Sequence, residues 1–347
     1  MSYIEFKYTI SNFNASSDHL ELKFEMINSY DRDLYFSRRG TPFDSYLCDC
    51  FIIKHNNDVG LKFDGLLVTR IEESGEDILT LKSGETLETT LKISTFYKFY
   101  HTGNYEIQFN IDNFRFLLET KVAINNLATY YKPIIIVNKP HFFSIDIKSF
   151  LFKTIGDKYR EDDKIKEDTG IRFSCNATDK EKDILRRITD ELITFYTKHE
   201  QNSEIQIYDD VFYKRWFGSK FATNNRKVID TLSFTFKKIK EKNILYCIDN
   251  SCISYCDYAY TVDGSKRITI LPPFWQALDD KSFYSKSVII LHEFTHVVGL
   301  TNHYIESNVC NGLKLAINDC DKAILSPYSY QYYIADLMCK PSLPQNC

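Results

Sequence analysis

The stretch Val288-Ile-Ile-Leu-His-Glu-Phe-Thr-His-Val-Val-Gly-Leu300 holds the pattern that decides the fold of the second half of the chain. It is an apolar run that carries His292, Glu293 and His296 in an HExxH arrangement. Two histidines four residues apart lie on the same face of a helix, so both imidazoles can bind one metal ion. Gly299 follows at a point where a helix can end with a positive φ. The stretch therefore predicts a helix that carries a zinc site.

The HExxH arrangement is typical of hydrolases that activate water. Zinc lowers the pKa of a bound water to about 7 and polarises a carbonyl group. A carboxylate beside the metal, here Glu293, can take the proton from that water and pass it to the leaving amine. The same five-residue pattern also arises by chance in ordinary amphipathic helices. The apolar flanks and a third histidine after the expected turn, His303, favour the zinc site.

The length and composition of the chain limit its class. With 347 residues it is long enough for two domains, and 44% hydrophobic and 26% charged residues are typical of a globular protein. The net charge of −4 and the dispersed Lys and Arg residues provide no basic surface for nucleic acid. No run reaches the roughly 18 apolar residues that cross a membrane. We therefore expect neither nucleic acid nor a membrane as a partner.

The cysteines and the N-terminus bear on the compartment. Ten cysteines, most of them in the last hundred or so residues, favour disulfides in an oxidising compartment, and the alternative is buried, reduced thiols. The first residues, Met1 to Ile10, alternate like a strand and lack the pattern of a signal peptide. We expect either export by another route or retention inside the cell.

Alternating segments between turn residues mark residues 1–130. This pattern predicts an antiparallel β-sandwich of about seven strands. Residues 131–170 change character, from the apolar Pro133–Val137 to a charged run over Asp157–Asp168, and are expected to form a linker. The expected strands are Ile4–Ile10, Leu20–Ile27, Cys50–Lys54, Leu66–Ile71, Thr86–Ile93 and Tyr105–Ile111.

Helical periodicity dominates residues 171–347. Apolar residues recur at helical spacing over Asp179–His199 and Asn225–Lys242, and a last helix is expected near Pro327–Met338. A strand over Arg267–Leu271 is stopped by two prolines. The second half is therefore expected to be mainly α.

Ordered landmarks extend over residues 173–338 around the HEFTH motif. They are Phe173-Ser-Cys175, Arg215-Trp-Phe-Gly218, Tyr258-Ala-Tyr260, Ile268-Thr-Ile-Leu-Pro-Pro-Phe-Trp275, Leu315-Ala-Ile-Asn318 and Ser329-Tyr-Gln-Tyr-Tyr333. With them the second half resembles the deuterolysin and peptidyl-Lys metalloendopeptidase family, the aspzincins. The first half is similar to that family's β-sandwich propeptide through Asn28–Leu34, Gly40–Pro42 and Leu81–Thr86.

The resemblance implies a multidomain chain with three parts. They are an N-terminal antiparallel β-sandwich over residues 1–130, a linker over 131–170 and a C-terminal, mainly α, zincin-like metalloprotease domain over 171–347. It also implies a secreted precursor held by disulfides, with Cys175 and Cys247 at positions like those of one family disulfide.

The third zinc ligand departs from the family pattern. In the family, an Asp in a GTxDxxYG segment completes the site and its Tyr stabilises the oxyanion. Alignment of Thr301 on the family Thr places His303 at the ligand position and Glu306 at the Tyr position. We predict one zinc ion held by His292, His296 and His303, with Glu306, Asp319 and Asp321 as alternatives for the third ligand. Tyr304 is the candidate for the oxyanion hydroxyl, and the alternative is that zinc alone stabilises the oxyanion.

Residues near the last helix bear on specificity. The acidic residues that select Lys in peptidyl-Lys members align with Tyr328 and Gln331, so a strong preference for Lys has no electrostatic source there. Asp336 could orient an imidazole, although a surface position is the favoured alternative for it and for Ser329 and Tyr330.

The sequence thus predicts a zinc metalloendopeptidase that acts on proteins or peptides, with Glu293 as general base and then acid. The resemblance implies secretion. One alternative is a catalytically inactive zincin-fold binding protein. Another is an effector protease without a leader, cytoplasmic or delivered, that cuts a single target. The sequence does not predict an oligomeric state.

Overall fold

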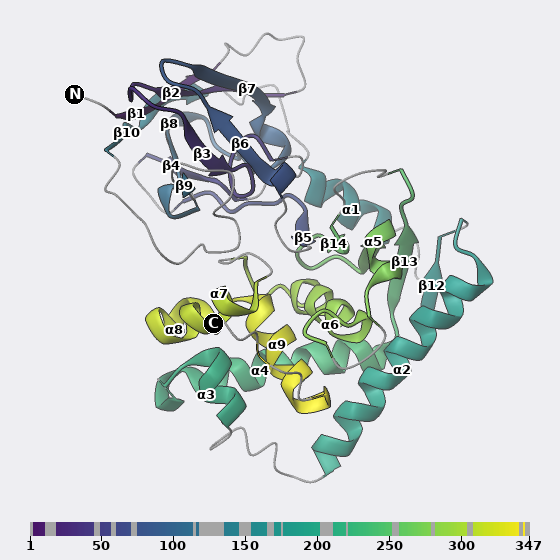
Figure 1. Cartoon of the computed structure of the whole chain (residues 1–347). Helices are drawn as coiled ribbons and strands as arrows, with labels where there is room; N and C mark the ends of the chain where they lie inside the picture. Colours follow the sequence, from purple (N-terminus) through teal and green to yellow (C-terminus); the bar gives the residue numbers. More distant parts are fainter. Residues whose placement is uncertain are drawn as a thin grey trace. The chain divides into compact units, whose positions relative to one another are not determined.

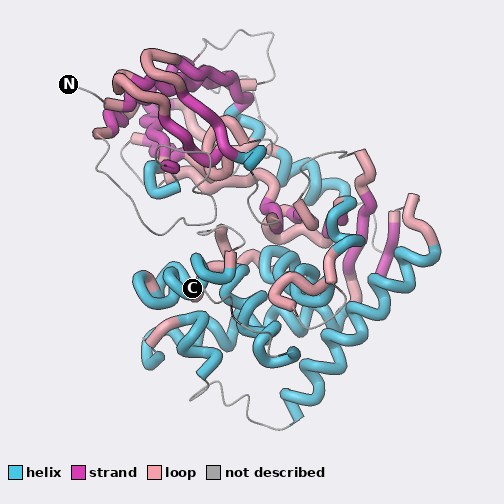
Figure 2. Tube along the Cα trace, in the orientation of Figure 1, coloured by secondary structure: helices cyan, strands magenta, loops and turns pink. Residues whose placement is uncertain are grey.

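The structure is a computed structural model, and its chain divides into two compact units. Unit 1 comprises Met1–Leu66 and Glu73–Lys158, and unit 2 comprises Leu67–Glu72 and Tyr159–Cys347. Strands predominate in unit 1 and helices in unit 2 (Figures 1 and 2), as the sequence predicts. The residues that the structure describes are 3–10, 19–44, 49–56, 60–70, 75–113, 116–117, 135–145, 154–164, 170–174, 176–201, 211–219, 221–251, 257–278, 282–303, 308–339 and 343.

The described residues of unit 1 form three sheets with the strand orders β10-β1-β2-β7, β11-β8-β4 and β6-β3-β9. Among these strands, each pairing is antiparallel except that of β1 with β10, which is parallel. The strands are β1 Ile4–Ile10, β2 Glu21–Asn28, β3 Leu34–Ser37, β4 Phe51–His55, β6 Ile78–Leu81, β7 Thr86–Lys92, β8 Gly103–Phe109, β9 Phe116–Leu117, β10 Ile136–Asn138 and β11 His141–Ile145.

The alternation along β2 shows why this part of the chain forms sheets. Leu22, Phe24 and Met26 are fully buried, and the polar residues between them are not. The Phe24 ring lies 6.1 Å from that of Phe51 in β4 and 5.7 Å from that of Phe109 in β8, measured between centroids. Aromatic side chains from two sheets therefore share one core.

Residues 131–170 were expected to form a linker, but the structure shows two strands within them, β10 and β11. β10 pairs with β1, and β11 pairs with β8, so both strands are part of the sheets of unit 1. The helix α1, Ile155–Lys164, follows, and unit 1 extends to Lys158. The apolar run that was expected to open the linker contributes Ile136 and Val137 to β10, a strand at the edge of its sheet.

Unit 2 contains a five-stranded sheet surrounded by helices (Figure 1). Its strand order is β12-β13-β15-β14-β5, with β14 antiparallel to both neighbours. The strands are β12 Ile171–Phe173, β13 Ile244–Ile248, β14 Ala259–Thr261, β15 Arg267–Ile270 and β5 Leu67–Thr69. The helices are α2 Asp179–Gln201, α3 Val211–Phe217, α4 Phe221–Glu241, α5 Pro272–Gln276, α6 Lys286–Val297, α7 Val309–Asn318, α8 Cys320–Ala323 and α9 Pro327–Cys339.

The strand expected over Leu66–Ile71 forms, but in the other unit. β5 pairs with β14, with Thr69 opposite Ala259, Val68 opposite Tyr260 and Leu67 opposite Thr261. The chain thus leaves unit 1 after Leu66, adds one strand to the sheet of unit 2 and rejoins unit 1 at Glu73. An alternating pattern predicts a strand, but it does not name the sheet that the strand joins.

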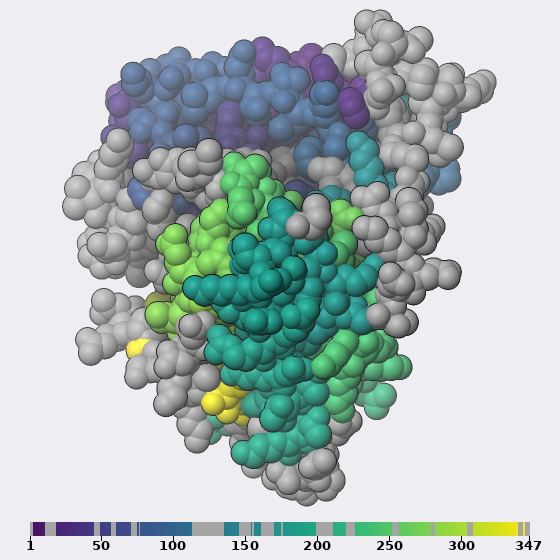
Figure 3. Space-filling view, turned by 90° about the vertical axis from the view of Figure 1, so that its right-hand side faces the viewer, coloured from purple at the N-terminus to yellow at the C-terminus, as the bar shows by residue number. Residues whose placement is uncertain are grey.

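The helix α6 is the centre of unit 2. All its residues are buried, and polar side chains find partners inside the protein, as where Lys286 donates to the carbonyl of Ala277 and Ser287 donates to Glu191. It contacts α2, α4, α9, β14 and β5. At the other extreme, the long helix α2 contributes to the surface seen in Figure 3, where the teal residues face the viewer. None of the described helices is long and apolar enough to cross a membrane.

The landmark pair Arg215-Trp216 fixes α3 to α9. Arg215 Nη1 and Trp216 Nε1 donate to Asp336 Oδ2 over 2.7 and 2.6 Å. Asp336, Ser329 and Tyr330 are all buried, so the favoured surface position was wrong for each of them. Burial of a carboxylate requires such partners, and they explain why Arg and Trp occur together in this landmark.

Cysteine pairing is described for one residue of unit 2. Cys310 takes part in a disulfide. The bridge expected between Cys175 and Cys247 involves Cys175, which lies outside the described residues.

Candidate metal centre

Helix α6 and the turn after it bring three histidines together. His292 and His296 lie one turn apart in α6, and the helix ends where Gly299 adopts a φ of 71° and its N–H donates to the carbonyl of His296 over 2.8 Å. A residue with a Cβ is strained at this φ. The reversal turns the chain so that His303 faces the two histidines of the helix.

The three imidazoles converge on one point. One nitrogen from each ring lies within 4.8 Å of the others, and this group is the one cluster suited to a metal within the described ranges. His303 Nε2 lies 3.4 Å from His292 Nε2 and 2.7 Å from His296 Nε2. Zinc–nitrogen bonds of about 2.0–2.1 Å in a tetrahedron separate the ligand atoms by about 3.3 Å. The first distance fits zinc, and the second fits after a shift of about half an ångström.

The amide of Gln331 fixes the proton on His292. Gln331 Nε2 donates to the carbonyl of Phe283 over 2.7 Å, so its oxygen faces His292 Nδ1, 2.8 Å away. An amide oxygen only accepts, so Nδ1 of His292 carries the proton. Nε2 is thereby left with its lone pair, which is the state that binds a metal.

Thr295 and Thr301 fix the position of the proton on His296 in a similar way. Thr295 donates its hydroxyl to the carbonyl of His292 over 2.7 Å, because that oxygen can only accept. Thr301, 2.9 Å from the Thr295 oxygen, must then donate to Thr295. The Thr301 oxygen is left to accept from His296 Nδ1, 3.1 Å away. The chain of hydrogen bonds again leaves Nε2 unprotonated.

Burial keeps the histidines neutral. It lowers the pKa of His296 to about 3, and it lowers the pKa of His292 and of His303 well below the ordinary value, with a further contribution from the neighbouring histidines. The guanidinium of Arg70 adds to the effect on the pKa of His303. Neutral imidazole is the form that binds a metal ion.

Glu293, the residue after His292 in α6, is fully buried. Its Oε1 accepts a hydrogen bond from the hydroxyl of Thr69 in β5. Burial raises the pKa of Glu293 to about 8, against a lowering effect of the hydrogen bonds from the side chain and backbone of Thr69. Its Oε2 has no hydrogen-bond partner among the residues that the structure describes. This oxygen is the one available to a water or a substrate.

Tyr328 is a site residue whose place the sequence did not predict. Its fully buried ring lies 4.5 Å from that of His292 and 5.3 Å from that of His303, between centroids. Its hydroxyl accepts from the backbone N–H of Arg70 over 3.0 Å. The alignment marked this position as one that faces the substrate in the family, but it did not show the contact with the histidines.

The other candidates for the site fall in three groups. Tyr304 and Glu306 lie outside the described residues. Asp319 caps α8, because its Oδ1 accepts from the N–H of Lys322 over 3.0 Å. Neither Asp319 nor Asp321 is in the cluster of metal-suited groups found in the described part of the chain. The structure thus brings His303 to the pair in α6.

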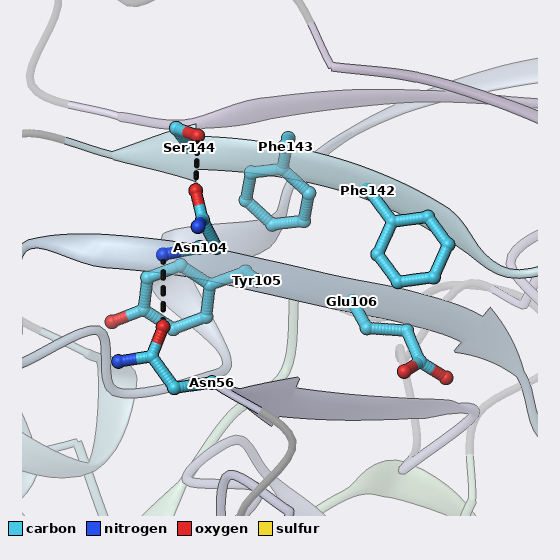
Figure 4. Close-up of a pocket in the computed structure, with 7 residues that line it drawn as sticks. All are labelled: Asn56, Asn104, Tyr105, Glu106, Phe142, Phe143 and Ser144. Carbon is cyan, nitrogen blue, oxygen red and sulfur yellow. Dashed lines mark hydrogen bonds between the residues drawn. The ribbon is translucent and has the colours of Figure 1, made fainter.

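A separate pocket lies in unit 1, over β8 and β11 (Figure 4). Its polar groups bond to one another: Ser144 donates to Asn104 over 2.6 Å, and the N–H of Asn104 donates to Asn56 over 3.3 Å. Glu106 at its rim pairs with Lys54, 3.6 Å away. The polar groups of this pocket are thus paired with one another or with a neighbouring residue.

Two comparisons with known proteins give matches to part of this chain. Residues 206–335, which contain α6, His303 and Tyr328, match the model of the family described as lysine-specific metallo-endopeptidase. A solved zinc peptidase from Grifola frondosa is 18% identical, with a TM-score of 0.41 over 46% of this chain and 98% of that chain. A comparison with curated proteins gives no match. The matched segment agrees with the resemblance that the landmarks predict: residues 206–335 are similar to the aspzincin family, and this match supports a zinc metalloendopeptidase.

Proposed function

We propose that His292, His296 and His303 hold one zinc ion and that Glu293 moves the proton in peptide hydrolysis. The observation that carries the proposal is the convergence of three neutral imidazoles, within 4.8 Å of one another, beside a buried carboxylate. Three protein ligands leave a fourth position open, as catalytic zinc sites do.

The chemistry divides between the ion and the chain. When bound, zinc makes a water molecule acidic near neutral pH and polarises the carbonyl that is attacked. Glu293 accepts the proton of the attacking water, and it gives a proton to the amine when the C–N bond breaks. A carboxyl whose pKa burial raises to about 8 can both accept and donate near neutral pH, and a cation beside it would lower this value.

Tyr328 is our candidate for the group that stabilises the oxyanion. Its hydroxyl reaches the backbone of Arg70, the residue that follows the partner of Glu293. A hydroxyl at this position can donate to a substrate carbonyl as negative charge develops on its oxygen. It would supply what the family Tyr of the altered GTxDxxYG segment supplies.

Unit 1 has the role of a propeptide-like domain in this proposal. Its two sheets β10-β1-β2-β7 and β11-β8-β4 form a sandwich, and the contacts of Phe24 with Phe51 and Phe109 support this arrangement.

The proposal is tested by zinc content and peptide cleavage on the same samples. We expect about one zinc per wild-type chain, loss of zinc and cleavage in His303→Ala, and a Glu293→Gln protein that keeps zinc but loses at least about 10³-fold in kcat. A Glu293→Gln protein that still cuts would refute the role of Glu293. Zinc retained in His303→Ala would refute the third ligand.

Replacement of Tyr328 separates oxyanion stabilisation from metal binding. We expect Tyr328→Phe to lower kcat by about 10²-fold, with KM and zinc content close to the wild type, because only the transition state loses a hydrogen bond. Tyr332→Phe is the matched control, since Tyr332 is buried in the same helix and packs its ring 6.0 Å from that of Tyr328. Equal loss of rate in both variants would contradict the assignment.

A further inference from the structure

The pocket over β8 and β11 in unit 1 has the size of a small-molecule site (Figure 4). Its volume of about 500 Å³ lies within the range of about 300–1,000 Å³ that is typical of such sites. In the two strands, Phe142 lies opposite Glu106 and Ser144 lies opposite Asn104. Side chains two positions apart in a strand share a face, so these four lie on the same face of the sheet. They are spaced by about 5 Å across the strands and about 7 Å along them, which suits one small ring.

Phe142 gives this face an exposed aromatic ring. The residue is 66% exposed, and it lies with Glu106 toward one end of the pocket. Asn104 and Ser144 lie toward the other end (Figure 4). The flat face of an aromatic ring packs against apolar groups, and a pocket that combines aromatic rings with a few polar groups is typical of small-molecule sites. A ligand that fits this pocket therefore has an apolar face and polar groups around its edge.

The hydrogen bonds within the pocket leave N–H donors unused. Asn104 Oδ1 accepts from Ser144, and no described residue accepts a hydrogen bond from the Asn104 amide nitrogen. The Asn56 amide nitrogen lies 3.2 Å from His55 Nε2 and donates to it, because an amide nitrogen only donates. That bond uses one of the two N–H groups of Asn56. Both amides therefore still have N–H groups to offer to a ligand.

The pocket also offers acceptors, and its charges offset one another. The carboxylate of Glu106 only accepts, and the hydroxyl of Ser144 keeps its lone pairs when it donates to Asn104. Lys54 Nζ lies 3.6 Å from Glu106 Oε1. An anionic ligand would meet the carboxylate, and a cationic ligand would meet the ammonium group. The pocket therefore favours a neutral ligand whose polar groups both donate and accept.

A sugar ring has this combination of properties. Hydroxyl groups both donate and accept, and a pyranose carries several of them around a ring whose C–H groups form an apolar face. An extended peptide suits the pocket less well, because a peptide added to a sheet bonds to main-chain groups at an edge strand. The groups available here are side chains on the face of the sheet.

We propose that this face of β8 and β11 binds a neutral sugar ring, free or at the end of a glycan. Phe142 packs against the C–H face of the sugar, Asn104 donates to its hydroxyls and Glu106 accepts from them. The site uses none of the residues of the metal centre, so the inference is independent of the proposed function. It gives unit 1 a binding role of its own.

Saturation-transfer NMR on the full-length chain tests the site. The probes are the methyl glycosides of glucose, galactose and mannose, and N-acetylglucosamine. At least one should bind, with the strongest signals from the C–H protons of one ring face, because that face lies on Phe142. Phe142→Ala should abolish the signal and Phe142→Trp should retain it. Tyr100→Ala is the matched control, since Tyr100 is 60% exposed in unit 1 and does not line the pocket.

Variants of the polar residues test the recognition of hydroxyls. Asn104→Ala and Glu106→Gln should each weaken binding of the best glycoside about tenfold, because each removes a hydrogen bond or its charge. Gln108→Ala should bind like the wild type, since Gln108 follows on the same face of β8 but does not line the pocket. Glucuronate should bind more weakly than glucose, and Glu106→Gln should abolish this difference. Circular dichroism shows that each variant is folded.

Three outcomes would overturn the inference. They are the absence of binding for all four sugars, sugar binding that persists unchanged in Phe142→Ala, and equal binding of cyclohexylmethanol, which has an apolar ring but no hydroxyls around it. An oligosaccharide that ends in the best sugar distinguishes the two sources of the ligand. Tighter binding than that of the single sugar indicates the end of a glycan, and equal binding indicates the free sugar.

Discussion

At the scale of single residues, neighbouring side chains that do not bind the metal decide which nitrogen of each α6 imidazole carries the proton. The Gln331 oxygen accepts from Nδ1 of His292, because the amide nitrogen is bound to Phe283. The Thr301 hydroxyl accepts from Nδ1 of His296, because its own proton goes to Thr295. Neutral, oriented imidazoles bind zinc more tightly than free ones.

Loss of the Gln331 contact should weaken the metal site. We expect Gln331→Leu to lower zinc affinity about 10- to 100-fold, measured by competition with a chromogenic chelator, because His292 loses its acceptor. Gln331→Glu keeps an acceptor for His292 Nδ1 and should stay close to the wild type. If both variants bind zinc alike, the amide has no orienting role.

At the scale of elements, the turn after α6 decides where the third histidine lies. Gly299 has a φ of 71°, and a Cβ there would lie 2.7 Å from Asp263 Oδ1. Gly264 has the same φ, with no atom within 4 Å of an added Cβ. A comparison of alanine substitutions at the two positions therefore distinguishes the effect of backbone strain from that of steric contact.

Alanine at these two positions should therefore act differently. Gly264→Ala should cost about 1 kcal/mol in free energy of unfolding, because of the positive φ alone. Gly299→Ala should cost more, because the Asp263 side chain must also move, and should lower zinc affinity, because strain at the positive φ falls in the turn that leads to His303. Urea unfolding and chelator competition measure the two effects. Equal stability and equal zinc affinity in the two variants would show that the turn does not position the ligand.

Local patterns account for the elements that the sequence predicts well. The helix expected over Asp179–His199 is α2, Asp179–Gln201, and the one expected over Pro327–Met338 is α9, Pro327–Cys339. Spacing within one helix also predicts that His292 and His296 share a face. Contacts between distant segments were not predictable in this way: Thr69 reaches Glu293 across 224 positions, and Arg70 reaches Tyr328 across 258. Periodicity carries no information about such partners.

At the scale of the whole molecule, acid should destabilise unit 2 in the metal-free protein. The folded-state pKa of His296, about 3, lies below its ordinary value of 6.5, and those of His292 and His303 are lowered too. Because the unfolded chain binds these protons more readily, the contribution to stability is complete above pH 6.5 and is lost as the pH falls toward the folded-state pKa.

We expect the metal-free protein to be less stable at pH 5 than at pH 7. His296 contributes about 2 kcal/mol of this loss, His292 and His303 add to it, and Glu293, whose pKa is raised to about 8, acts in the opposite direction. Urea unfolding is followed by the fluorescence of Trp216 and Trp275, the two tryptophans of the chain, which both lie in unit 2. His303→Ala removes one titrating group and should show a smaller difference between the two pH values. Stability that is independent of pH over this range would contradict the neutral, buried state of the cluster.

Because Leu67–Thr69 pairs with β14 in the sheet of unit 2, a shortened chain without this segment would have an exposed sheet edge. A chain that begins at Tyr159 lacks β5, so β14 would present its unpaired N–H and C=O groups to solvent. Open edges of this kind invite pairing between identical chains, and side chains that are now fully covered, such as Ala259 and Thr261, would be uncovered along that edge. The strand that hydrogen-bonds to Glu293 through Thr69 thus also covers an edge of the sheet at which identical chains could pair.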